Sequence, residues 1–180
     1  MNIADQFQLW ETEGKVGVSS DQLQDWMAKQ SPDTWHKIAM SWQYDCEATP
    51  LLWMVNQPAC DFGTACQIFG TEGHNWMTNP TWQELDHDSY RTSWKMCDKI
   101  IERWHANSFP TSELKPATGV MKTHKLMESR HKDVGRSLTW VVPEHVYQYE
   151  GSREAQSQYA SHDGQIYWDF DFWRKLAGFT

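Results

Sequence analysis

The sequence predicts a mainly α, single-domain helical bundle with an irregular or short β element toward the C-terminus. Helix-capping signals recur through the first two thirds of the chain, and the apolar residues after them repeat at spacings of three and four. The length of 180 residues suits one domain with a substantial core. We therefore treat residues 1–180 as one domain.

The first helices are marked by their N-terminal caps. Ser19 lies three residues before Gln22, which is the spacing of a capping box. The apolar run LLWMV, which follows Pro50, predicts a short buried helix. A capping residue followed by proline marks three helix starts: Ser31–Pro32, Thr49–Pro50 and Asn79–Pro80.

The strongest helical pattern covers residues 86–106. Its apolar positions are spaced by four, three, four and three: Tyr90, Trp94, Cys97, Ile101 and Trp104. Charged residues fill the rest of the circumference: Arg91, Lys95, Asp98, Lys99, Glu102 and Arg103. We therefore expect one buried face and one solvated face.

The pattern weakens after residue 110. Proline and glycine interrupt residues 111–136, which predicts a mobile loop with one short helix near 121–131, on whose solvated face His124 and His131 lie. Residues 137–142 could begin a short strand, which Pro143 would end. For residues 165–176 the periods of a strand and of an amphipathic helix fit equally well.

Charge and hydropathy restrict the class of partner. The formal charge is −8, and residues 115–136 alone carry +4, so the rest of the chain carries −12. Such a field repels nucleic acid and anionic membrane and favours a basic partner. The N-terminus has no secretory signal pattern and no apolar run is long enough to span a membrane, so we expect a cytoplasmic protein.

A resemblance lies in the densest part of the chain, residues 35–70. WHKIAMSWQYD followed by TPLLWMVNQPACDFGTACQIF resembles the core of a small bacterial family of unknown function. Its most specific part is the Cys-Asp-x-Gly-Thr-Ala motif: Cys60, Asp61, Gly63, Thr64 and Ala65. Cys66 replaces the family's usual leucine, and Cys46–Glu47 replaces an acidic-Gly pair. Some related proteins act as immunity partners of secreted toxins, so the resemblance implies that role.

The motif itself reads mainly as structure. Asp61 is placed to cap a helix by accepting from the N–H of Gly63 or Thr64. Gly63 would permit the close approach of a neighbouring backbone. His36, within an otherwise apolar helix pattern, is interpreted as a hydrogen-bonded core or boundary histidine.

Chemistry is the weaker interpretation. A hydrolase or other enzyme using Cys60, His36 or Asp45 is an alternative. However, no Cys-x-x-Cys pair or protease signature is present, and the thiols are expected to be reduced and mostly buried. The cluster of Asp86, His87 and Asp88 lacks metal-ligand spacing, so we expect no metal. No glycine-rich phosphate loop is present, so we expect no nucleotide cofactor.

Recognition of a protein partner is therefore the preferred hypothesis. Aromatic rings beside carboxylates suit docking on a basic cleft. We expect an immunity protein that neutralises a basic toxin by covering it, rather than an enzyme; a structural homo-oligomer subunit is a further alternative. The expected contacts are Trp42, Tyr44, Asp45, Glu47, Tyr167, Trp168, Asp169, Asp171 and Trp173.

Overall fold

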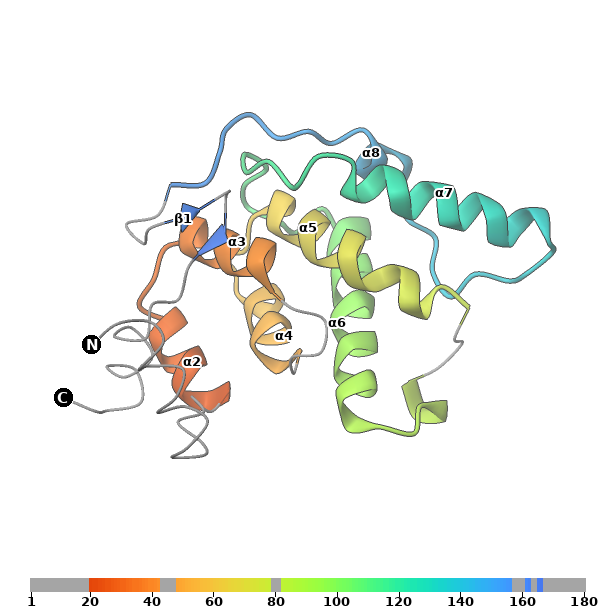
Figure 1. Cartoon of the computed structure of the whole chain (residues 1–180), viewed down its shortest axis with the longest axis horizontal. Coiled ribbons are helices and arrows are strands. Elements are labelled where there is room, and N and C mark those ends of the chain that lie inside the picture. Colours follow the sequence, from red (N-terminus) through yellow and green to blue (C-terminus); the bar gives the residue numbers. More distant parts are fainter. Residues whose placement is uncertain (1–19, 43–47, 79–81, 157–160, 163–164, 167–180) are drawn as a thin grey trace.

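The regular structure of the chain is almost entirely helical (Figure 1). The computed structural model describes residues 20–42, 48–78, 82–156, 161–162 and 165–166. The α-helices are α2 (Ser20–Met27), α3 (Pro32–Ser41), α4 (Thr49–Asn56), α5 (Phe62–Glu72), α6 (Asp88–His105), α7 (Val120–Asp133) and α8 (Glu144–Tyr147). Two 3-10 helices, η1 (Gly73–Trp76) and η2 (Trp82–Glu84), join α5 to α6. The predicted mainly α fold in one domain is confirmed.

The β structure is small. The strands β1 (Ser161–His162) and β2 (Gln165–Ile166) pair antiparallel, and β2 lies against α3. The predicted short β element near the C-terminus is therefore present. The undecided segment beyond residue 166 lies outside the described residues.

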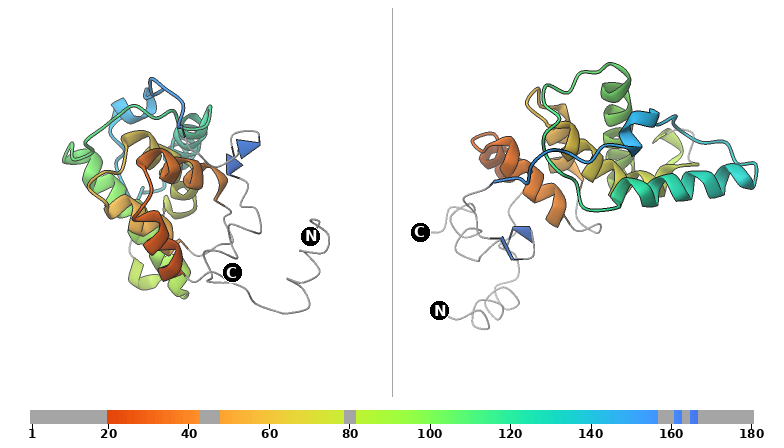
Figure 2. Two further views of the ribbon diagram at one scale, coloured as in Figure 1. Left: turned by 90° about the vertical axis from the view of Figure 1, so that its left-hand side faces the viewer. Right: turned by 90° about the horizontal axis from the view of Figure 1, so that it is seen from above.

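Helix α5 is the centre of the fold. It packs against α3, α6 and α7, while α4 packs against α2 and α6. Its residues 63–70 are all buried, and they include Phe69, which is fully inaccessible and contacts the ring of Trp104. After α8 the chain runs back across the molecule toward α3, so the last described loop lies beside one of the first helices (Figures 1 and 2).

The predicted caps are confirmed in part. Ser31 caps α3, because its side-chain oxygen accepts a hydrogen bond from the N–H of Thr34 at 3.4 Å, and Pro32 begins the helix. The prediction for Thr49 was wrong by one position: Thr49 is already helical and Ala48 precedes α4 without a side-chain cap. Ser19 and the pair Asn79–Pro80 lie outside the described residues. The predicted short buried helix corresponds to α4.

Helix α6 follows the predicted pattern with two corrections. Trp94, Cys97, Ile101 and Trp104 are buried as expected, but Tyr90 is 53% exposed, because it lies in the first turn. Arg103 was expected in solvent and is only 7% exposed. Its polar head is hydrogen-bonded to carbonyl oxygens, which is how a cation is accommodated in the interior.

The segment after residue 110 contains a longer helix than predicted. Helix α7 spans 14 residues, longer than the helix expected near 121–131. His124 was expected on its solvated face but is 3% exposed, and its ring packs on Phe69 with centroids 4.7 Å apart. Burial lowers the pKa of His124 to about 4, so the ring is neutral at pH 7. Residues 137–142 form no strand; they lead through Pro143 into α8.

Within the described ranges, no helix combines the length and apolarity that a membrane crossing requires.

Candidate functional site

Asp61 organises the candidate site from the N-terminus of α5. Its side chain accepts hydrogen bonds from three backbone N–H groups: Gly63 at 2.7 Å, Glu113 at 3.0 Å and Leu114 at 3.2 Å. The predicted cap is confirmed, and Asp61 also fixes the 113–115 segment against the helix end. A carboxylate that accepts several backbone donors at a helix N-terminus is strongly stabilised there.

Gly63 allows this segment to approach. A Cβ atom built on Gly63 would lie 1.8 Å from the carbonyl oxygen of Leu114, so only glycine fits at this position. The predicted close approach of a neighbouring backbone is confirmed. The Cys-Asp-x-Gly-Thr-Ala motif thus forms the surface against which residues 113–115 pack.

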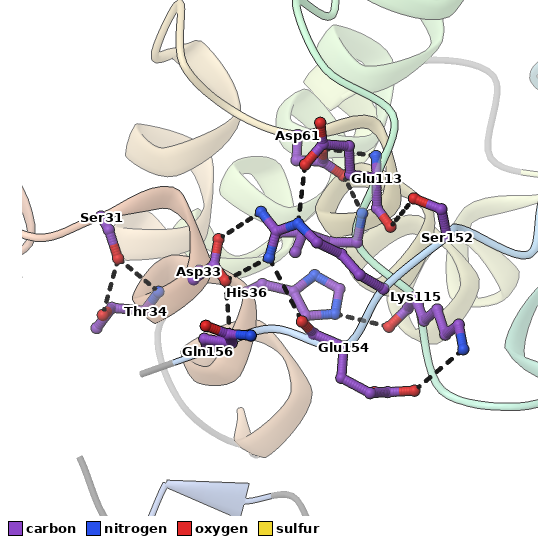
Figure 3. Close-up of polar contacts among 12 residues, drawn as sticks. Ser31, Asp33, Thr34, His36, Asp61, Glu113, Lys115, Ser152, Glu154 and Gln156 are labelled. Carbon is purple, nitrogen blue, oxygen red and sulfur yellow. Dashed lines mark hydrogen bonds and ion pairs between the residues drawn. The ribbon is translucent and has the colours of Figure 1, made fainter. Parts of the chain in front are cut away.

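His36 connects α3 to the same region. Its Nε2 lies 2.8 Å from the carbonyl oxygen of Lys115 (Figure 3). Its Nδ1 lies 3.0 Å from Oγ1 of Thr64. Because a carbonyl can only accept, Nε2–H is the donor and Nδ1 accepts from the threonine hydroxyl. Burial lowers the pKa of His36 and favours this neutral form. The predicted role of a hydrogen-bonded core histidine is confirmed.

A charged cluster closes the site on the outside. Arg153 donates to Asp33 through Nη1 at 2.6 Å and Nη2 at 3.0 Å, and through Nε to Glu113 at 2.8 Å. The backbone N–H of Gln156 also donates to Asp33, at 2.6 Å (Figure 3). The bond from the Arg153 guanidinium is the main cause that lowers the pKa of Asp33. This bidentate pair ties the loop after α8 to α3 across 120 residues.

The thiols of the described region are sealed in the core. Cys60, Cys66 and Cys97 are free and fully buried, which confirms the predicted buried, reduced state for these three. Burial raises the pKa of the Cys60 thiol to about 12 and raises those of Cys66 and Cys97 well above the usual range. Since the thiolate is the reactive form, these groups are poor nucleophiles in the folded protein.

A second buried acid lies away from this cluster. Glu72, at the end of α5, is 8% exposed, and burial raises its pKa to about 7. Its carboxyl is thus partly protonated at neutral pH. Ionisation of this buried carboxyl destabilises the folded protein. Nothing in the sequence pattern indicated that Glu72 would be buried.

The predicted metal-like cluster has other roles. His87 caps α6 by accepting from the N–H of Ser89 at 3.3 Å, and Asp88 pairs with Arg91 at 2.9 Å. Among the described residues no group of three or more His, Cys, Asp or Glu side chains could hold a metal ion.

Only one of the nine predicted partner contacts lies in the described part of the chain. Trp42 follows α3 and is half-buried against the core, and its indole Nε1 has no hydrogen-bond partner in the described ranges. Tyr44, Asp45, Glu47 and the contacts within residues 167–173 lie outside those ranges. Their proposed role therefore remains a prediction.

The sequence analysis did not predict the roles of two arginines: Arg103, which is buried in the interior, and Arg153, which forms the charged cluster. A signal for Arg103 existed, because Met96, Ile100 and Arg103 continue a second buried row at spacings of four and three. For Arg153 no local signal existed, since its partner lies 120 residues earlier.

The arrangement as a whole is a mainly helical scaffold in which Asp61, His36 and the Asp33–Arg153 pair hold backbone segments together. No protein-family model matches this chain, and no curated protein or solved structure matches it either.

Proposed function

We propose that the protein is a binding protein that recognises a basic protein partner, and that it acts as an immunity protein by covering a toxin. The observation that carries this proposal is a set of exposed carboxylates with no ion-pair partner in the described part of the chain: Asp21, Asp25, Glu84 and Asp86. Together with the net charge of −8, they provide a field that attracts cations.

Part of the basic segment is already paired with acids. In and after α7, Lys125 pairs with Glu144 and Lys132 pairs with Glu128. These lysines are thus already neutralised by acids of their own neighbourhood. The unpaired acids on α2 and before α6 remain available to a basic partner.

The geometry also favours recognition over reaction. The hydrolase alternative would require Cys60 and His36, but the Cys60 thiol is buried and both ring nitrogens of His36 are hydrogen-bonded. Both would have to leave their present contacts before they could attack a substrate.

The test is binding to a purified basic protein encoded beside this gene. Association and dissociation rates would be measured by surface plasmon resonance at about 0.05 and 0.5 M salt, across which electrostatic steering is strongly screened. We expect a fast association that slows at high salt, and rescue of growth when both proteins are co-expressed. Absence of binding at micromolar concentration would refute the proposal for that partner, and a partner that binds without toxicity would refute the immunity role.

A matched pair of variants locates the contact. Asp169→Lys with Asp171→Lys alters the predicted contact segment, and Asp133→Lys with Glu150→Lys makes the same change of net charge at exposed sites elsewhere. The first variant should raise the dissociation rate about a hundredfold or more, whereas the control should change only the association rate. Equal dissociation rates for the two variants would exclude the 167–173 segment from the interface.

A further inference from the structure

A pocket of about 280 Å³ lies where α5 begins and α6 ends. Its walls come from segments far apart in the sequence: the first residue of α5, the last turn of α6, the 107–112 loop, α8 and Tyr149. Its volume is near the lower end of the ~300–1,000 Å³ that is typical of small-molecule sites. It therefore suits a ligand of roughly the size of a single aromatic ring with a short polar substituent.

Aromatic rings form the apolar part of this pocket. The ring of Phe62 lies 5.7 Å from that of Phe109 and 4.7 Å from that of Tyr149 between centroids. His145 adds an imidazole 5.9 Å from the same ring. Planar ligands gain both buried area and favourable edge or face contacts among such rings.

Arg103 supplies a fixed positive charge in the wall. A guanidinium has five N–H groups. Four of them donate to neutral oxygens: those of Val55 and Gln57 and two of Ser108. Within the described ranges, the fifth has no acceptor and the guanidinium has no carboxylate partner.

Trp104 lies in the same wall and is 1% exposed, but its indole Nε1–H is sealed within the core and is not open to the pocket. The remaining N–H of Arg103 is therefore the donor that a ligand in the pocket could meet. Buried donors are almost always paired in native proteins, so this N–H indicates a missing acceptor. The adjacent acid Asp61 is not this acceptor, because its oxygens already accept from three backbone N–H groups.

We propose that this pocket binds a small aromatic carboxylate, with the ring against Phe62, Phe109 and Tyr149 and the carboxylate accepting from Arg103. A carboxylate matches the unpaired N–H and neutralises the buried cation, whereas a cationic ligand would be repelled by Arg103. The site is independent of the proposed protein-binding surface. Although the protein is acidic overall, this pocket would therefore favour an anion.

The test uses three probes that share one ring: phenylacetate, the neutral phenylacetamide and the cationic 2-phenylethylammonium. Each is titrated into the full chain while the indole N–H signals are followed by ¹H–¹⁵N NMR, with the Trp104 signal assigned by its loss in Trp104→Phe. We expect phenylacetate to shift that signal with a Kd of about 1 mM or tighter. The amide should bind at least about tenfold more weakly, and the ammonium should not bind.

A blocking variant gives the control. Ser112 lines the pocket and is exposed, so Ser112→Phe places a ring in the pocket mouth, whereas Ser129→Phe adds the same ring to the exposed surface of α7. Phenylacetate binding should be lost in the first variant and unchanged in the second, while both unfold at the temperature of the parent protein. Binding that survives Ser112→Phe, equal affinity for acid and amide, or no shift of the Trp104 signal at about 10 mM phenylacetate would overturn the proposal.

Discussion

Replacing Gly63 with alanine would place a methyl group inside the backbone contact that joins α5 to the 113–115 segment. The added Cβ would lie 1.8 Å from the carbonyl oxygen of Leu114 and 2.8 Å from its carbonyl carbon. Real Cβ contacts are essentially never shorter than 3.0 Å, so the carbonyl would have to retreat by about 1.2 Å. Backbone atoms, unlike the end of a flexible side chain, cannot make that movement cheaply.

The cost can be worked from what the movement disturbs. Leu114 is fully buried, its N–H donates to Asp61 at 3.2 Å, and its carbonyl accepts from the hydroxyl of Tyr149 at 3.1 Å. Overpacking costs about 1–3 kcal/mol, and each weakened hydrogen bond adds about 1 kcal/mol. The better helix propensity of alanine offsets at most about 1 kcal/mol. We expect a net loss of about 3 kcal/mol, a large share of the ~5–15 kcal/mol that holds a domain folded.

Urea unfolding followed by far-UV circular dichroism measures this loss. The midpoint should fall in Gly63→Ala while the dependence on urea stays the same, because the folded and unfolded surfaces are unchanged. Gly119→Ala is the matched control: Gly119 has φ of 82° and no atom within 4 Å of its added Cβ, so it costs only the left-handed strain of about 1–2 kcal/mol. If Gly63→Ala were no more destabilising than this control, the close contact would not restrict the sequence and our reasoning about the motif would fail.

Three further predictions concern ionisable groups. Glu72→Gln should stabilise the protein by on the order of 2–3 kcal/mol at pH 8 and by almost nothing at pH 4.5. Burial raises the pKa of Glu72 from 4.5 to about 7, so the parent protein loses stability at about 1.4 kcal/mol per unit as the pH rises from 4.5 to about 7, and loses no more above that pH. Glu84→Gln, at an exposed site, is the control in the same urea titrations. Arg153→Ala should lower the free energy of unfolding by about 1–3 kcal/mol at pH 7 in the same assay. The lowered pKa of Asp33 stabilises the fold above pH 3.8, and this stabilisation is lost on acidification, so the difference between variant and parent should shrink below pH 3.8. A constant difference down to pH 2 would contradict the ion pair. In a Cys46→Ser variant, Ellman's reagent should label none of Cys60, Cys66 and Cys97 until the chain is unfolded, and rapid labelling of Cys60 in the native state would revive the hydrolase alternative.

Local chemistry made part of the fold and site predictable. The Asp61 cap follows from a carboxylate placed two residues before a glycine at a helix start, and the close approach at Gly63 follows from the missing side chain. The mainly α fold follows from periodic burial, which is also a local property. These features need only neighbours in the sequence, so the sequence was sufficient for them.

The errors at His124 and Arg103 share one physical cause. His124 and Arg103 are polar, so hydropathy alone places them in solvent, yet both are buried by tertiary contacts that supply neighbours from other helices. The Asp33–Arg153 pair and the anion pocket depend on segments that meet only after the chain has folded. No local pattern encodes such meetings, because the partners lie on the order of 50–120 residues apart.

The return of the chain to α3 also sets an order of events during protein synthesis. Asp33 leaves the ribosome early, but the guanidinium of Arg153 and the amide of Gln156 that neutralise and bind it emerge only after 120 further residues have been translated. Until then the nascent chain carries this acid, in the first turn of α3, without its partners. The native arrangement is therefore locked late, by its last described loop, and chains interrupted before residue 153 would lack that lock and be favoured substrates for proteolytic quality control.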